Sequence, residues 1–222
     1  PGFGCGTCAR CKADEHSLCR HYSIRGETVD GGMCDRVCVP ADQLLACPLA
    51  PASAAALPLS LLTAWHMLVA RAQVQPGQHV LVQAGASGVG SLAIQVARMH
   101  GANVVATAST EEKRSRCREL GAAAAWHYDE VRTEAKTWTG GGGFDIVVDH
   151  VGSDTWKSST RALAWGGTFV TCGATTGHQV GLDLRHLFFK QISVLGSTMG
   201  SMGDMRAAWA AVVDGRILPV LD

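Results

Sequence analysis

The chain has 222 residues, 47% of them hydrophobic, which is enough for one large domain or for one domain plus part of another. Nineteen Lys and Arg residues balance nineteen Asp and Glu residues. Because the charges balance, the composition shows no excess of positive charge that would favour binding to nucleic acid or an anionic membrane. The expected partner is therefore a small-molecule substrate. The longest apolar stretch, 57–70, is interrupted by polar residues and falls short of the roughly 20 residues that span a bilayer. No signal peptide opens the sequence, so we expect a cytoplasmic protein.

The first part of the chain, 1–51, is rich in Gly, Cys and turn residues and carries only short apolar runs. One such run, 36–40, predicts an isolated strand. These residues cannot build a core alone, and we interpret them as the remnant of a larger domain. From residue 52 the apolar positions fall at helical spacing, which marks the start of a second domain, 52–215. Residues 216–222 begin a further strand that returns to the first domain.

Strands and helices alternate through the second domain. The apolar runs predict strands at 79–83, 103–107, 123–127, 145–149, 167–172 and 192–196. Helical periodicity and terminal glycines predict helices at 89–100, 111–120, 129–138, 155–163, 184–189 and 203–215. Six strands joined by helical crossovers predict an α/β fold, a doubly wound Rossmann sheet with parallel strands.

Four of the nine cysteines crowd into the first nineteen residues. Cys5, Cys8, Cys11 and Cys19 form the pattern C-x2-C-x2-C-x7-C among several glycines. Four thiolates fill a tetrahedral zinc shell and leave no open position, so the predicted site is structural. Two disulfides and an iron-sulfur cluster are the alternatives. The remaining cysteines are expected to be small buried apolar residues: Cys34, Cys38, Cys47, Cys117 and Cys172. His16 and His21 are expected at the surface, because the shell has no vacancy.

The cysteine pattern and the preceding Pro1-Gly2-Phe3-Gly4 resemble the structural-zinc lobe of medium-chain zinc-containing alcohol dehydrogenases, in the alcohol dehydrogenase and quinone oxidoreductase superfamily. Residues 1–51 would then be the remnant of a β-rich catalytic domain. Family members are longer at both ends. The resemblance therefore implies a piece that lacks the first part of the catalytic domain and the C-terminal end.

A glycine-rich loop follows the first predicted strand of the second domain and opens a helix. Gly85, Gly88 and Gly90 have the spacing G-x-x-G-x-G, with Ala86, Ser87 and Val89 between them. Glycines permit a tight turn and a close approach to a pyrophosphate, whose charge is met by backbone N–H groups at the helix N-terminus. Such loops also serve purely structural roles. Together with the zinc lobe, this one resembles the cofactor loop of the family.

The end of the second strand decides which dinucleotide is expected. An acidic residue there would bind the ribose 2′-hydroxyl of NAD, but this strand ends in Ser109 and Thr110. These hydroxyls can donate to a phosphate, and Lys113 and Arg114 add positive charge, tempered by two neighbouring glutamates. NADP is therefore the expected cofactor, with NAD as the alternative. An ordinary solvated helix face would also explain Lys113.

The resemblance implies four further cofactor contacts. Tyr128 packs near the same phosphate, Val151 and Gly173 lie along the nicotinamide half, and Thr63 supports its ring. His150 is interpreted as a capping or core histidine, and no catalytic residue is assigned. Many relatives have a catalytic-zinc ligand four residues before the threonine, where this chain has Leu59. A catalytic zinc is therefore in doubt.

Three hypotheses remain at this stage. The leading one is an NADP(H)-dependent oxidoreductase that interconverts alcohols with aldehydes or ketones by hydride transfer. The second, favoured by Leu59, is a zinc-free reductase of quinones or activated double bonds. The third is a truncated nucleotide-binding module without activity. The sixth strand, 192–197, resembles the edge through which family members pair, so a homodimer or homotetramer is expected.

Overall fold

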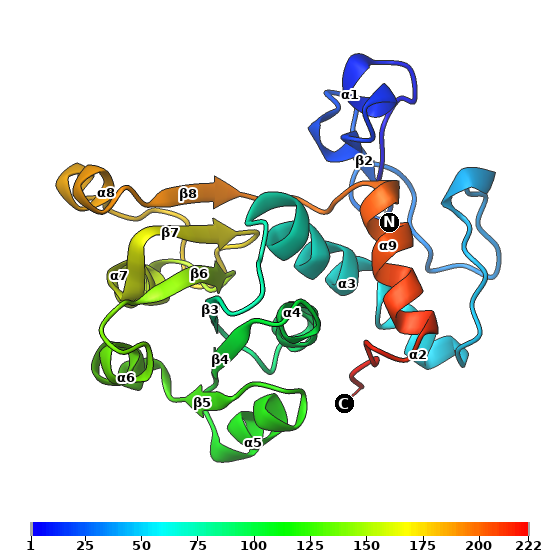
Figure 1. Ribbon diagram of the computed structural model, residues 1–222. Helices are drawn as coiled ribbons and strands as arrows, with labels where there is room; N and C mark the ends of the chain where they lie inside the picture. The colour runs from blue at the N-terminus through cyan, green and yellow to red at the C-terminus, as the bar shows by residue number, and fades with distance from the viewer. Residues whose placement is uncertain (1, 222) are drawn as a thin grey trace.

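The computed structural model describes residues 2–221 and divides into a small lobe and a layered α/β domain (Figure 1). The lobe contains β1 (Gly2–Phe3), α1 (Ala9–Lys12), the 3-10 turn η1 (His16–Leu18) and β2 (Ser23–Ile24). β1 and β2 pair as a two-stranded antiparallel sheet. A long loop with one 3-10 turn, η2 (Ala41–Gln43), leads to α2 (Pro51–Ala55). Among the described residues before 51, only Cys11 and Cys19 have buried hydrophobic side chains. This lobe therefore has almost no apolar core.

The α/β domain is built on a six-stranded parallel sheet with the order β5-β4-β3-β6-β7-β8. The strands are β3 (His79–Val82), β4 (Asn103–Thr107), β5 (Ala124–Trp126), β6 (Phe144–Asp149), β7 (Leu163–Thr171) and β8 (Ser193–Gly196). The chain runs outward from β3 to β5 and then returns to place β6 on the other side of β3. The strand order therefore reverses between β3 and β6, which is where doubly wound sheets bind ligands, beyond the carboxyl ends of the strands. The predicted fold class is confirmed.

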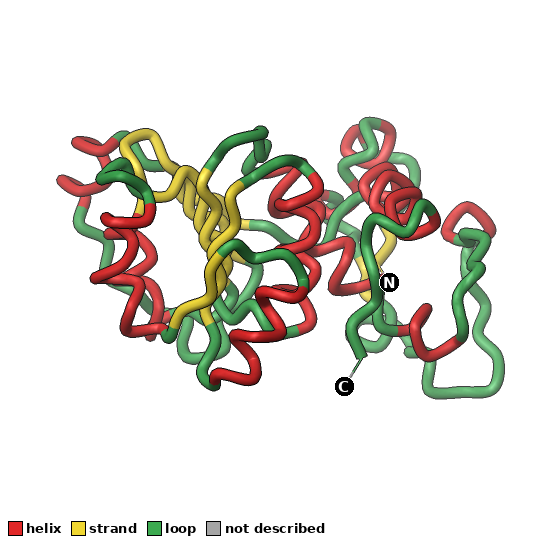
Figure 2. The backbone as a smooth tube through the Cα atoms, turned by 60° about the horizontal axis from the view of Figure 1, so that its bottom comes forward, coloured by secondary structure: helices red, strands yellow, loops and turns green. Residues whose placement is uncertain are grey.

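Helices cover both faces of this sheet (Figure 2). One face packs against α4 (Gly88–Met99) and α5 (Glu111–Glu119), with α3 (Pro58–Trp65) beside α4 and α9 (Met202–Val213) packed on α3. The other face packs against α6 (Val131–Trp138), α7 (Ser153–Ala162) and α8 (Leu184–Lys190). Alternation along β3 produces the two cores, because Val80 and Val82 enter the first whereas Leu81 enters the second. A π-helical turn, η3 (His66–Arg71), extends α3, and the 3-10 turn η4 (Tyr128–Glu130) precedes α6.

Several sequence predictions are wrong in detail. Residues 36–40 form a loop, because no described segment pairs with them, and Val37 and Val39 remain exposed. Residues 217–221 also form no strand; residue 222 lies outside the described residues. The helix predicted to reach residue 163 ends at Ala162, and β7 begins at once with Leu163, four residues before the predicted strand. Early pairing with β6, where Phe144 meets Leu163, accounts for the longer strand.

The isolated cysteines also depart from expectation. Cys117 is buried and Cys172 is half-buried, but Cys34, Cys38 and Cys47 are exposed. All three lie on the long loop between β2 and α2, where there is no apolar core to receive them. His21 is exposed as expected, whereas His16 is half-buried. Within residues 2–221, no helix has the length and apolar character needed to cross a membrane.

Candidate dinucleotide site and four-cysteine lobe

The glycine loop joins β3 to the N-terminus of α4, at the position where the strand order reverses. Ser87 caps the helix: its Oγ accepts a hydrogen bond from the Gly90 backbone N–H at 3.0 Å. Ala84 just before the loop has a positive φ of 50°, which turns the chain sharply out of the strand. The Gly88 and Val89 N–H groups of the first helical turn have no hydrogen-bond acceptor among the described residues. This is the geometry that receives an anionic group at a helix N-terminus.

Two of the three glycines are required by close packing. A Cβ atom at Gly90 would lie 2.2 Å from the Ala84 carbonyl oxygen, and one at Gly85 would lie 2.7 Å from the Ala106 Cβ. Gly88 is looser, since the nearest atom to its added Cβ is the Ser60 Oγ at 3.1 Å. Gly85 and Gly90 therefore hold α4 against the strands. Gly88 is the exposed member of the set and faces α3. Ala86 and Val89, the other apolar residues of the glycine loop, are half-buried against the core.

A side-chain hydrogen bond links this loop to the neighbouring strand. The Ser87 Oγ and the His150 Nε2 are 2.9 Å apart, and His150 follows directly after β6. Burial lowers the pKa of His150, so its ring is neutral at neutral pH. The Nδ1 atom is buried without a partner in the described part of the chain. His150 thus ties two of the crevice loops together, a positioning role that the sequence alone did not suggest.

Asp149 organises the same region from inside the sheet. Its carboxylate is fully buried and accepts four hydrogen bonds. Backbone N–H groups of Val151 and Gly152 bind Oδ1 at 2.8 and 3.1 Å, while the hydroxyls of Thr155 and Ser159 bind Oδ2 at 2.7 and 2.9 Å. The four donors fix the turn from β6 into α7. A carboxylate directly after the apolar run 146–148, at the carboxyl end of a strand, is the signal that could have identified it.

The network continues across the sheet to the glycine loop. Gln83 donates to the Ser159 Oγ at 2.9 Å and accepts from the Thr107 hydroxyl at 2.6 Å. The same Thr107 Oγ accepts from the Ala84 N–H at 3.1 Å. A continuous buried chain of hydrogen bonds therefore connects Asp149 with the residue that begins the glycine loop. Such a fully partnered network stiffens the crevice, because breaking any member leaves buried polar atoms without partners.

The predicted phosphate-binding residues lie at the carboxyl end of β4. Ser109 and Thr110 are both exposed, and Thr110 caps α5 by accepting from the Lys113 backbone N–H at 3.2 Å. The Lys113 ammonium is exposed and has no ion pair among the described residues. Arg114, in contrast, is bound to Glu111 at 2.9 Å. Among the described residues, Lys113 thus pairs with no carboxylate, and of the two neighbouring glutamates Glu111 is engaged by Arg114 and Arg118 whereas Glu112 forms no ion pair.

The remaining predicted contacts lie at the carboxyl ends of neighbouring strands. Val151 and Gly173 follow β6 and β7, and their loops are joined where the Thr176 N–H binds the Val151 carbonyl at 2.7 Å. A Cβ at Gly173 would lie 3.2 Å from the His150 carbonyl oxygen. Thr63 is buried on α3, with its hydroxyl bound to the Leu59 carbonyl at 2.8 Å. Tyr128 follows β5, and burial raises its pKa. Val151, Gly173 and Tyr128 all lie beyond the carboxyl ends of strands. Thr63 lies on α3.

The four cysteines of the lobe converge as the sequence pattern predicted. Their sulfur atoms all lie within 4.8 Å of one another, and the Cys8 and Cys19 sulfurs are 3.8 Å apart. Zn–S bonds of about 2.3 Å in a tetrahedron require sulfurs about 3.8 Å apart. Backbone N–H groups of Cys5 and His21 point at the Cys19 sulfur at 3.5 and 3.4 Å. This donor set and spacing fit a closed zinc shell.

One glycine of the lobe is needed for that convergence. A Cβ at Gly4 would lie 2.5 Å from the Cys11 sulfur and 3.2 Å from the Cys19 Cβ. The lobe is anchored to the α/β domain through Asp14, whose carboxylate accepts from the Ser201 hydroxyl at 2.8 Å and from the Gly203 N–H at 3.0 Å. A side chain from the lobe thereby joins the N-terminal cap of α9, which couples the lobe to the domain.

Comparison with known families agrees with this geometry. The model of the family described as zinc-binding dehydrogenase matches residues 88–214, more than half of the chain. The chain therefore belongs to the zinc-binding dehydrogenases, within the medium-chain dehydrogenase/reductase superfamily that the cysteine and glycine motifs resemble.

Similar proteins include alcohol dehydrogenases and reductases named for enoyl-CoA substrates. The crotonyl-CoA reductase of Streptomyces avermitilis is 34% identical, over 88% of this chain and 49% of its own length. A solved NAD-dependent alcohol dehydrogenase is 41% identical with a TM-score of 0.95, over 99% of this chain and 65% of that one. A 2-octenoyl-CoA carboxylase reductase, solved with NADP and 2-octenoyl-CoA, is 31% identical with a TM-score of 0.77, over 82% of this chain and 46% of that one. The chain thus spans about half the length of the curated relative.

Proposed function

We propose that this chain is the cofactor-binding part of an NADP(H)-dependent oxidoreductase that interconverts alcohols with aldehydes or ketones. The observation that carries the proposal is the convergence of the glycine loop, the exposed Ser109 and Lys113, and the Val151 and Gly173 loops at one edge of the parallel sheet. The N-terminus of α4 would meet the pyrophosphate, with Gly85, Gly88 and Gly90 allowing its approach. The nicotinamide supplies the hydride when bound, and the protein orients it.

The preference for NADP rests on the residues that follow β4. Ser109 and Thr110 offer hydroxyl donors, and the Lys113 ammonium has no ion pair within residues 2–221, while Glu111 is engaged by Arg114 and Arg118. An acid at the strand end would repel a 2′-phosphate, and none is present. One relative was solved with NADP and another is described as NAD-dependent, and a binding titration distinguishes the two cofactors.

Titration calorimetry with NADPH and NADH in parallel tests this preference. We expect NADPH to bind the unaltered chain about tenfold or more tightly than NADH, because charge-assisted hydrogen bonds to the 2′-phosphate are lost with NADH. Ser109→Asp should reverse the order, and Thr137→Asp, which adds the same charge at an exposed hydroxyl residue of α6, is the matched control and should leave the order unchanged. Equal binding of the two cofactors by the unaltered chain would refute the NADP preference.

A structural zinc in the four-cysteine lobe is the second part of the proposal. The sulfur spacing and the N–H groups aimed at Cys19 support it, because four thiolates leave no position for substrate. Metal analysis of the purified chain should give about one zinc per chain. Two disulfides in place of the metal would give no zinc and no free thiol among the four.

A second candidate function, reduction of an activated double bond, is favoured by two observations. By the family resemblance, Leu59 stands where many relatives have a catalytic-zinc ligand, and two relatives are named as a crotonyl-CoA reductase and a 2-octenoyl-CoA carboxylase reductase. The two candidates are separated by assaying the intact protein with alcohols and with enoyl thioesters after chelation. Thioester reduction that survives the chelator, without alcohol oxidation, would replace the first candidate.

We also propose that the chain pairs through the edge of its sheet. β8 is the outermost strand, and Val194 on β8 and Phe188 and Phe189 on α8 are exposed. Exposed apolar side chains beside an open strand edge favour pairing with a second copy. Light scattering should give a dimer or tetramer, and Val194→Lys should shift it toward monomer. A monomer for the unaltered chain would contradict the proposal.

A further inference from the structure

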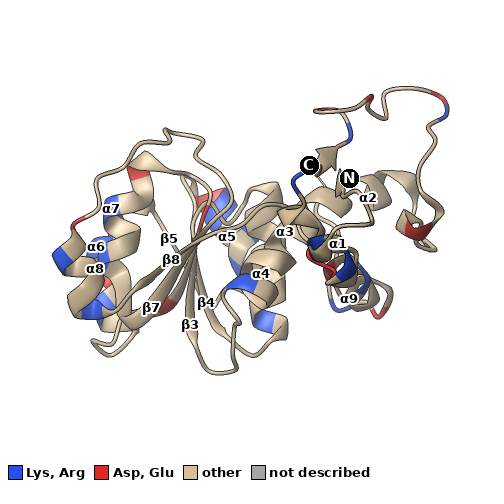
Figure 3. Cartoon of the chain, turned by 90° about the horizontal axis from the view of Figure 1, so that it is seen from above, with Lys and Arg blue, Asp and Glu red and all other residues tan. Residues whose placement is uncertain are grey.

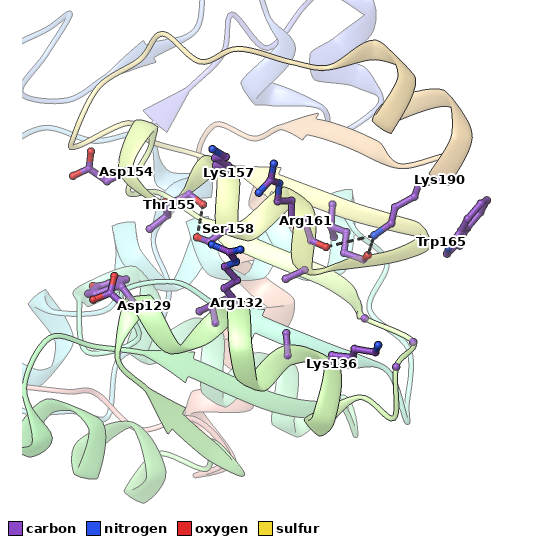
Figure 4. A pocket seen from close by; sticks show the side chains of 18 residues that line it. Asp129, Arg132, Lys136, Asp154, Thr155, Lys157, Ser158, Arg161, Trp165 and Lys190 are labelled. Atoms are coloured by element: carbon purple, nitrogen blue, oxygen red, sulfur yellow. Dashed lines mark hydrogen bonds between the residues drawn. The ribbon is translucent and has the colours of Figure 1, made fainter.

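A groove with a volume of about 720 Å³ runs between α6 and α7, on the face of the sheet opposite α4 and α5 (Figure 4). Five basic side chains line it: Arg132, Lys136, Lys157, Arg161 and Lys190. Figure 3 shows basic residues on α6, α7 and α8, at the end of the α/β domain away from α1 and the rest of the four-cysteine lobe. The chain as a whole is neutral, so this groove concentrates positive charge that composition alone does not reveal.

The spacing of the charges is regular. Arg132 and Lys136 lie four residues apart on α6, and Lys157 and Arg161 lie four residues apart on α7. Side chains at this separation are neighbours on a helix face, about 5–6 Å apart at Cβ. Like charges in such pairs are unfavourable, and here two pairs face one groove. A bound anion would relieve the repulsion in both helices.

Within residues 2–221, none of the four helical cations forms a salt bridge with a carboxylate. The two acidic residues of the groove, Asp129 and Asp154, lie at its far end from Trp165, as Figure 4 shows. The Asp129 carboxylate lies 3.3 Å from the Nδ1 atom of His127. Within residues 2–221 it pairs with none of the groove cations. Elsewhere in the chain arginines such as Arg116 and Arg216 do find carboxylate partners. The groove cations are thus left available.

The fifth cation has a fixed position. Lys190, at the end of α8, donates to the Leu163 carbonyl oxygen at 2.6 Å. Trp165, on β7, is 72% exposed and lies at the same end of the groove (Figure 4). This end therefore combines an anchored ammonium with an open aromatic face, close to the glycine segment 141–143.

We propose that this groove binds a small polyanion carrying two or more phosphate groups, at a site that adjoins the proposed dinucleotide crevice at Tyr128 but includes none of its other residues. Two cation pairs one helical turn apart suit a ligand with several anionic groups, because each pair can hold one group while the ligand spans the seam between the helices. Arginine supplies bidentate donors on both helices.

Titration calorimetry of the whole chain with sodium tripolyphosphate tests the proposal, at constant ionic strength. The unaltered chain should bind it, and Arg132→Gln/Arg161→Gln should weaken binding by about tenfold or more, because charge-assisted hydrogen bonds are lost on both helices. Arg116→Gln/Arg216→Gln, which removes the same charge from other surfaces, should bind like the unaltered chain. Thermal melts of each variant check folding.

Three results would overturn the groove site. Tripolyphosphate could fail to bind the unaltered chain, both double variants could weaken it equally, or Lys113→Gln could abolish binding while the groove variant does not. The last result would place the anion at the dinucleotide crevice. Citrate titrated in parallel separates phosphate recognition from general polyanion binding: binding as tight as that of tripolyphosphate would refute a phosphate site. NADPH titrations of the same variants test the proposed cofactor site independently.

Discussion

The four-cysteine lobe and the α/β domain achieve order by different means. The lobe buries almost no apolar side chains among its described residues and depends on four sulfurs within 4.8 Å of one another. The α/β domain buries two apolar clusters, one on each face of its sheet. A small segment without a core needs a metal or covalent cross-link, whereas a layered domain can tolerate polar groups inside because a large core surrounds them. The predictions below test this contrast.

The largest effect is expected from removing a ligand of the lobe. Cys11→Ser should reduce bound zinc from about one per chain to almost none, because three thiolates hold the metal poorly. The lobe should become sensitive to protease while the melting of the α/β domain changes little. Metal analysis and limited proteolysis measure both.

Cys34→Ser is the matched control, because Cys34 is exposed and lies outside the cluster. It should leave zinc content and proteolysis unchanged. Collapse of the whole chain in Cys11→Ser would show that the α/β domain depends on the lobe and would remove the contrast.

In the α/β domain, the largest effect is expected at Asp149. Asp149→Ala removes the acceptor of four hydrogen bonds in a buried site, and only the Thr155 hydroxyl keeps another acceptor, the Gly152 carbonyl oxygen at 3.3 Å. The free energy of unfolding should fall by about 3 kcal/mol or more. Denaturant unfolding measures this loss. Asp154→Asn, an exposed acid on α7, should cost almost nothing, and equal losses would refute the role assigned to the buried network.

A smaller effect is expected in the glycine loop. Gly90→Ala should lower the free energy of unfolding by about 1–3 kcal/mol, because the new Cβ meets the Ala84 carbonyl oxygen and α4 must shift. Gly88→Ala has more space and is the control within the same loop. Thermal denaturation of the two variants should separate them; a Gly88→Ala variant that is the less stable of the pair would contradict the packing argument.

The smallest effect concerns pH. Burial lowers the pKa of His150 in the folded chain below its ordinary value of 6.5. The unfolded chain therefore binds this proton more readily, so stability rises with pH between the folded and the ordinary pKa and falls as acid is added. His150→Gln should flatten that part of the stability curve, measured by denaturant unfolding from pH 5 to 7. An unchanged slope in the variant would exclude His150 as its source.

The sequence alone determined the fold class and the convergence of the four cysteines. Both depend on local patterns: the alternation of apolar runs with helical periodicity, and the short spacing between ligands. The glycine spacing likewise predicted the turn from β3 into α4. Predictions failed where a partner was needed, since a β-prone run such as 36–40 becomes a strand only if another strand pairs with it.

Only the tertiary structure decided the rest. Asp149 accepts hydrogen bonds from residues up to ten positions along the chain, and the linked Gln83 and Thr107 lie directly after β3 and at the end of β4. Arg132 and Arg161 share a groove because α6 and α7 pack side by side on one face of the sheet. Cys34, Cys38 and Cys47 are exposed because their loop has no core to enter. These features depend on which distant segments meet, and a pattern along the chain does not contain that information.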